Sequence, residues 1–107
     1  MTSYYPSSPK ARSLLRELLN GREMSVIDTL MEFNLMTPNA RVSEMRKMGW
    51  PIKSLKQPHP TLLTEKITVY YMDVRFRKWW LDNWQHASPA DYENAEGRGK
   101  FKEVHDD

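Results

Sequence analysis

The N-terminal part of the chain carries a regular apolar stripe. Five apolar side chains recur at steps of one, three or four residues: Ala11, Leu14, Leu15, Leu18 and Leu19. This spacing puts them on one face of a helix, and Ser8 and Pro9 stand in the preferred N-cap and first-turn positions. Asn20-Gly21 ends the pattern. We therefore expect an amphipathic helix here, preceded by a flexible arm over residues 1–9.

A second, shorter helix is predicted to begin at Ser25. Asp28 stands three residues later, which gives an acidic variant of the capping box. Asn34 suits the residue that leaves a helix with a positive φ. The buried side of this helix is expected to hold Ile27, Leu30, Met31 and Phe33.

A third helix is predicted after the short turn from Asn34 to Thr37. Thr37 fits the N-cap and Pro38 fits the first turn, while Gly49 ends the segment. Val42 and Met45 stand three residues apart on the side that would meet a core. The opposite side carries polar and basic residues with no acid among them: Asn39, Ser43, Arg46 and Lys47.

The sequence period changes after Gly49. Residues 50–56 form a short extended run, and residues 67–72 alternate and are rich in β-branched and aromatic types. The two runs predict a β-hairpin whose ten-residue loop is stiffened by two prolines. Asp73 then fits the N-cap of a last helix. The polar, charged sequence from Ser88 onward predicts a tail that is disordered or folds only with a partner.

The order helix, helix, short turn, helix, hairpin is that of a winged helix-turn-helix. In such a domain the third helix enters the DNA major groove, which admits one helix, and the hairpin reaches along the backbone. We therefore predict a mainly α fold with a small β-hairpin. The winged helix-turn-helix domain would span residues 10–72, followed by a C-terminal helix over 73–87 and an acidic tail over 88–107.

The sequence itself resembles a known family along the same stretch. The segment LMTPNARVSEMRKMGWPIKSL, followed by TEKITVYYM, is similar to small winged-helix proteins and domains common in phages and proteobacteria. The resemblance covers about residues 10–72, and its most specific part is residues 40–46 with Gly49 and Ile52 in place. Two departures are Met45, where the family has leucine, and a hairpin loop that lacks the usual glycine. The resemblance implies a DNA-binding winged helix.

Charge is unevenly distributed along the chain. The net charge is +2 over 107 residues, but residues 88–107 hold six acids and three bases, which leaves +5 on the first 87 residues. A basic body with an acidic tail suggests a nucleic-acid partner. Between residues 37 and 66, six bases stand against two acids, and such a surplus is what phosphate contacts need.

The candidate DNA contacts lie on the third helix and the hairpin. They are Thr37, Asn39, Arg41, Ser43, Arg46, Lys47, Lys53, Lys56, His59 and Lys66. Arg46 has the donors for a bidentate hydrogen bond to guanine, and Asn39 can hydrogen-bond to adenine. Lys47 is suited to a contact with a backbone phosphate. The alternative for the helix is an ordinary solvated surface. Arg41 has an ion pair with Glu44 as its alternative role, and His59 has that of a plain loop residue.

The last helix is rich in aromatic residues. Phe76, Trp79, Trp80 and Trp84 exceed what the core of so small a winged domain needs, and basic residues flank them. Three uses stay open for them. They pack on the first helix to complete the core, they form a homodimer interface, or they contact a membrane surface or stacked bases.

No pattern in the chain indicates an enzyme. The three histidines are scattered, and neither a Gly-rich phosphate loop nor a Ser-His-Asp context is present. The lack of cysteine excludes disulfides and thiolate metal sites. We expect no catalytic residue, no metal and no cofactor. Because neither a signal peptide nor an apolar run of roughly 18 residues is present, a cytoplasmic protein without membrane contact is expected.

Two functional hypotheses follow from the sequence. The first is sequence-specific or semi-specific binding of duplex DNA, as a transcriptional regulator or as a phage-type architectural or recombination accessory factor. A homodimer is one possible form of such a DNA-binding protein. The alternative is a winged-helix module, or small inhibitor, that binds another protein through the C-terminal helix and the acidic tail.

Overall fold

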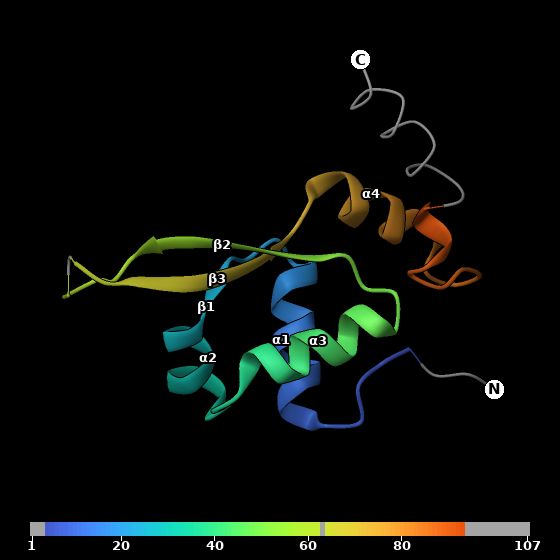
Figure 1. Ribbon diagram of the computed structural model, residues 1–107. Coiled ribbons are helices and arrows are strands. Elements are labelled where there is room, and N and C mark those ends of the chain that lie inside the picture. Colours follow the sequence, from blue (N-terminus) through green and yellow to red (C-terminus); the bar gives the residue numbers. More distant parts are fainter. Residues whose placement is uncertain (1–3, 63, 94–107) are drawn as a thin grey trace, which may run out of the picture.

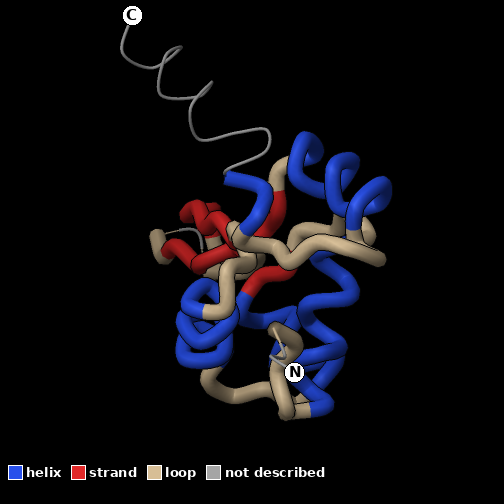
Figure 2. Tube along the Cα trace, turned by 90° about the vertical axis from the view of Figure 1, so that its right-hand side faces the viewer, coloured by secondary structure: helices blue, strands red, loops and turns tan. Residues whose placement is uncertain are grey.

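A computed structural model describes residues 4–62 and 64–93 of the chain. Within these residues the elements are α1 (Pro9–Leu19), β1 (Met24–Ser25), α2 (Val26–Phe33), α3 (Pro38–Lys47), β2 (Ile52–Pro58), β3 (Lys66–Met72) and α4 (Val74–Asn83). The first three helices lie on one side of the strands and α4 on the other, as two views at right angles show (Figures 1 and 2). The described part is thus a small mixed α/β fold.

The sheet has three antiparallel strands in the order β1-β3-β2. β1 pairs Met24 with Tyr70 and Ser25 with Val69, so it ties the segment between α1 and α2 to the hairpin. The sequence did not predict this strand, because two residues are too few to show an alternating pattern.

The hairpin is longer and its loop shorter than predicted. Pairing runs from Ile52 opposite Met72 to Pro58 opposite Lys66, which leaves residues 59–65 as the loop. The loop is closed by the His59 N–H, which donates to the Glu65 carbonyl at 2.9 Å. Pro58 did not end the strand early because β2 is an edge strand, where proline is tolerated. Figure 1 shows the hairpin reaching well beyond the helices.

The helix ends follow the local signals in the sequence. Ser8 Oγ accepts from the Ala11 N–H at 3.3 Å, and the Ser25–Asp28 capping box is formed in both directions. Asn34 leaves α2 in the left-handed conformation with φ 54°. These predicted helix boundaries are confirmed.

The face of α2 that meets the core was predicted incorrectly. Leu30 is 44% exposed and Met31 is 78% exposed, whereas Thr29 is fully buried and donates its hydroxyl to the Val26 carbonyl at 2.9 Å. Ile27 and Phe33 are only partly buried. The apolar residues of α2 do form one side of the helix, but only Val26 and Phe33, at one edge of that side, pack against the core beside the buried Thr29.

Trp50 is the centre of the aromatic core. It is 1% exposed, and its indole lies 5.0 Å from the ring of Trp80 and 6.1 Å from that of Phe76. Its Nε1 donates to the Tyr4 carbonyl at 2.6 Å, and the Tyr4 ring packs edge-on against it. The flexible arm predicted for residues 1–9 is therefore wrong from Tyr4 onward, because this segment fastens to the core; residues 1–3 lie outside the described part.

The C-terminal segment also packs against the core. Pro89 is fully buried, and Tyr92, 8% exposed, lies 5.2 Å from Phe76 and 5.4 Å from Trp79 between ring centres. Gly49, with φ 109°, approaches this segment so closely that a Cβ would lie 2.9 Å from the Ala90 nitrogen. The predicted disorder from Ser88 is thus wrong for residues 88–93, and residues 94–107 lie outside the described part.

Candidate nucleic-acid interface

The side of α3 that faces away from the core is polar and basic, as predicted. Val42 and Met45 are fully buried, and they hold the helix against the core. The four residues of the opposite side are all exposed: Asn39, Ser43, Arg46 and Lys47. Glu44, the one acid of the helix, forms an ion pair with Arg41 at 3.2 Å. The outward side thus offers donors and positive charge.

Arg46 joins α3 to the sheet. Its Nε donates to the Ile52 carbonyl at the start of β2, at 2.7 Å, while the residue stays exposed. Since a guanidinium carries five N–H donors, the terminal nitrogens remain for another partner. Burial raises the pKa of the nearby Tyr70 phenol, and the positive charge of Arg46 opposes that rise. Tyr70 therefore remains protonated at neutral pH beside the Arg46 guanidinium.

The two lysines nearer the tip of the hairpin lie on the same face of the sheet as Tyr70. Strand residues alternate between faces, and paired residues of neighbouring strands share one. Lys56 and Lys66, both exposed, share the face of Ile52, Tyr70 and Met72, which are buried against the helices. Lys56 Nζ donates to Thr68 Oγ1 across the strands at 2.7 Å. This basic face continues outward from the helical layer.

Lys53 does not belong to that face. It is an odd number of residues from Lys56, so it lies on the opposite side of β2, where its Nζ pairs with Asp73 at 3.4 Å. Asp73 caps α4 by accepting from the Arg75 N–H at 2.8 Å. The structure thus separates Lys53 from the other predicted hairpin contacts.

Three further residues were predicted as DNA contacts: His59, Thr37 and Arg41. His59 Nδ1 accepts from the Thr61 and Leu62 backbone N–H groups, at 3.1 and 3.0 Å, so it shapes the hairpin loop. Thr37 is exposed at the N-cap position of α3 and makes no side-chain capping bond. Arg41 forms the ion pair that was one of its two alternatives, and its Nε is buried without a hydrogen-bond partner among the described residues.

The aromatic residues of α4 divide between the core and the surface. Phe76 and Trp80, 0% and 6% exposed, complete the core, and Trp79 packs partly buried against it. Trp84 is 49% exposed. Of the three uses open for this helix, the core packing is present for Phe76 and Trp80, and these two are not available as interface residues.

Sequence reasoning missed Tyr70 as a neighbour of the candidate interface. The signal was present in the alternation of residues 66–72, which places Tyr70 on the face of Lys66. It was not sufficient by itself, because alternation does not show which face of the strand adjoins α3.

The described residues define a small mixed α/β protein in which a basic helix side adjoins a basic hairpin face. No cluster of His, Asp and Glu side chains suited to a metal occurs in residues 4–62 and 64–93. Within the same residues, none of the helices has the length and apolar character to cross a membrane. Comparisons with protein-family models, with curated proteins and with solved structures find no match to this chain.

Proposed function

We propose that the protein is a winged helix-turn-helix that binds duplex DNA, with α3 in the major groove and the β2–β3 hairpin as the wing. The observation that carries the proposal is the acid-free, exposed side of α3, adjacent to the Lys56 and Lys66 face of the hairpin. A helix fits the major groove, and cations on two neighbouring elements can follow the phosphates on either side of it.

The roles of the residues differ in this proposal. Asn39 and Arg46 are the candidates for contacts with base edges, since amide and guanidinium groups match adenine and guanine in the major groove. Lys47, Lys56 and Lys66 supply phosphate contacts. Such a protein acts as a transcriptional regulator or as an architectural or recombination accessory factor.

The experiment that tests the proposal is fluorescence anisotropy with a labelled random duplex over a series of salt concentrations. The variant is Lys47→Ala with Lys66→Ala, because both side chains are exposed and neither has a hydrogen bond or ion pair within the described residues. Loss of two phosphate contacts should weaken binding and reduce the salt slope by about two, since each contact contributes roughly 0.9.

The matched control removes two charges elsewhere. Arg16→Ala with Lys78→Ala takes the same charge from exposed positions on α1 and α4. This control should retain most of the affinity and the salt slope. Equal losses in the two double variants would show that only net charge matters and would remove the assignment of α3 and the hairpin.

A further inference from the structure

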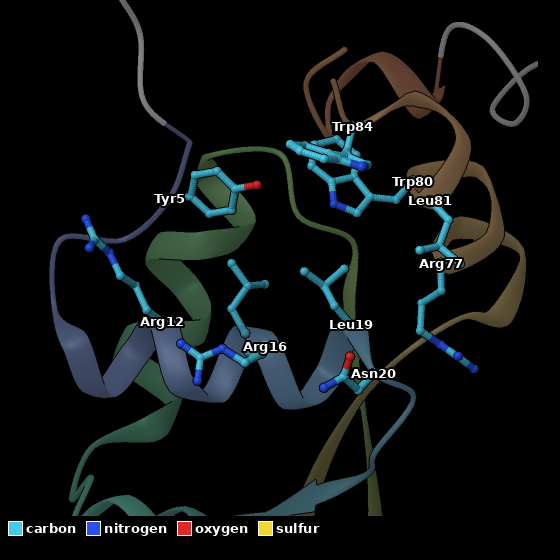
Figure 3. A pocket seen from close by; sticks show the side chains of 10 residues that line it. Tyr5, Arg12, Arg16, Leu19, Asn20, Arg77, Trp80, Leu81 and Trp84 are labelled. Atoms are coloured by element: carbon cyan, nitrogen blue, oxygen red, sulfur yellow. The ribbon is translucent and has the colours of Figure 1, made fainter. Parts of the chain in front are cut away.

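A pocket of about 410 Å³ lies between α1 and α4, and no residue of α3 or the hairpin lines it. Leu15 and Leu19 of α1 form its floor, and its opposite wall consists of Trp80 and Leu81 of α4 with Trp84, the residue directly after that helix. Figure 3 shows Leu19 pointing toward the two indoles, with Tyr5 on the other side of the opening. The volume lies within the range of ligand sites in proteins, and the lining is largely apolar.

Positive charge borders this apolar surface without any acid. Arg12 and Arg16 of α1 and Arg77 of α4 line the pocket, and no Asp or Glu does. None of the ion pairs among the described residues includes these three arginines. Arg12 and Arg77 use their Nε atoms to hold backbone carbonyls, of Pro6 at 2.6 Å and of Met72 at 3.2 Å. Their charges therefore have no carboxylate to neutralise them in the described residues.

The apolar surface extends beyond the pocket itself. Leu81 is 74% exposed and Trp84 is 49% exposed, so both present apolar area to solvent at its rim. A small molecule confined to the pocket would leave that area in water. A peptide that inserts one side chain and continues along the rim would cover it, which is the arrangement of an anchor residue with surrounding contacts.

We propose that the α1–α4 pocket docks an acidic segment of a partner protein, with one aromatic or aliphatic side chain of that segment inserted between the leucines and the indoles. Arg12 and Arg16 stand four residues apart, so they are about 6 Å apart along the axis of α1. Carboxylates on successive turns of a partner helix have the same spacing. Charge complementarity thus selects an acidic segment, and the concave apolar floor selects one with an anchor.

Two other anionic partners fit this surface less well. Duplex DNA would meet the arginines but has no side chain to fill an apolar floor. A lipid bilayer would meet Leu81 and Trp84 but could not reach Leu15, which is 2% exposed at the base of the pocket. Both alternatives are outcomes of the test.

The test uses the full chain and a short fluorescein-labelled peptide that carries one tryptophan between glutamates. Anisotropy reports binding, and the indole N–H signals of the ¹⁵N-labelled protein report where the peptide binds. The Trp84 signal should shift, whereas that of Trp79, packed on Tyr92 away from the pocket, should move little. A peptide with serine in place of its tryptophan, or lysines in place of its glutamates, should bind more weakly.

Variants of the protein separate this pocket from general charge. Arg16→Glu, at an exposed position without a partner, should weaken peptide binding about tenfold or more, the effect of one lost charge-assisted contact. Lys78→Glu makes the same charge change on α4 outside the pocket and should have little effect. Leu81→Ser tests the apolar rim at a residue that is exposed enough to leave folding intact.

The outcomes also separate this proposal from DNA binding. Arg16→Glu and Lys78→Glu should bind duplex DNA alike, whatever the peptide result. The docking proposal is overturned if both variants lose the peptide equally, or if no peptide binds. It is also overturned if duplex DNA or phosphatidylglycerol vesicles, and not the peptide, shift the Trp84 signal.

Discussion

Arg46 has a structural contact and a proposed DNA contact in the same side chain. Its Nε donates to the Ile52 carbonyl at 2.7 Å, so the guanidinium is fixed against β2. A side chain held in this way loses less entropy on binding than a free lysine. The neighbouring Lys47 has no such contact and is simply exposed.

The difference between these neighbours gives a prediction for stability. Arg46→Ala should lower the free energy of unfolding by about 1 kcal/mol, the usual net effect of one hydrogen bond, and should also weaken DNA binding. Lys47→Ala should weaken DNA binding while changing stability by less than about 0.5 kcal/mol. Urea unfolding and anisotropy on both variants check this. Equal stability of the two variants would mean that the Arg46–Ile52 contact contributes nothing.

The ionisation of Asp73 is linked to the stability of the fold. The Arg75 backbone N–H, and then the Arg75 and Lys53 side chains, lower the pKa of this carboxyl below its ordinary value of 3.8. Because the folded pKa is depressed, the stabilisation is fully present above 3.8 and is lost as the pH falls through the folded value.

The prediction for Asp73 follows from its role as the N-cap of α4. Asp73→Ala should lower the free energy of unfolding by about 1 kcal/mol near neutral pH, and the difference from the wild type should shrink below about pH 4. Asp73→Asn keeps a capping oxygen and should lose less at neutral pH. Urea unfolding at several pH values measures this; a constant difference across the range would argue against the capping carboxylate.

At the scale of the elements, α2 is the helix whose orientation could not be read from the sequence. Its ends obey local rules, since the Ser25–Asp28 box and Asn34 act within a few residues of the backbone they cap. Its buried side depends on contacts with α1 and with β3, and β3 belongs to a distant part of the chain. The sequence therefore predicted where α2 lies along the chain and not which way it faces.

Two methionine substitutions test that orientation. Met31→Ala, at a residue 78% exposed on α2, should change the free energy of unfolding by less than about 0.5 kcal/mol. Met45→Ala, at a fully buried residue on α3, should lower it by about 2–5 kcal/mol. Thermal or urea unfolding of the two variants measures both changes. Similar losses in both would restore the orientation of α2 that the sequence suggested.

For the hairpin of the candidate interface, too, the sequence predicted the elements but not the whole arrangement of their side chains. The sequence predicted both strands and the lysines that they carry. In the structure, Lys56 and Lys66 lie on the face beside α3 and Lys53 lies on the face beside Asp73. The separation of Lys53 from Lys56 follows from alternation along one strand, whereas the placement of Lys66 on the face of Lys56 requires the register between two strands.

At the scale of the whole molecule, segments near both ends of the described part close over the aromatic core. Tyr4 accepts from Trp50 through its carbonyl, and Tyr92 packs on Phe76 and Trp79. These residues lie outside the winged domain expected from the sequence. Because Tyr92 packs on two rings of α4 and Trp50 on two of them, α4 is part of the folded unit.

Tyr92 gives a prediction at this scale. Tyr92→Ala should lower the free energy of unfolding by roughly 2–3 kcal/mol, because it removes a buried ring and its contacts with two aromatic neighbours. Tyr92→Phe keeps the ring and should lose less than about 1 kcal/mol. Urea unfolding measures both. An alanine variant as stable as the wild type would mean that residues 88–93 do not contribute to the core.

The sequence by itself determined what depends on near neighbours. It specified the caps of α1 and α2, the glycine that ends α3, the alternation of the strands and the polar outward side of α3. Only the tertiary structure decided which side of α2 is buried, how β1 joins the sheet, which hairpin lysines share the face beside α3, and that α1 and α4 enclose a pocket. The reason is that these features arise from contacts between residues far apart along the chain, whose packing energy outweighs local preference.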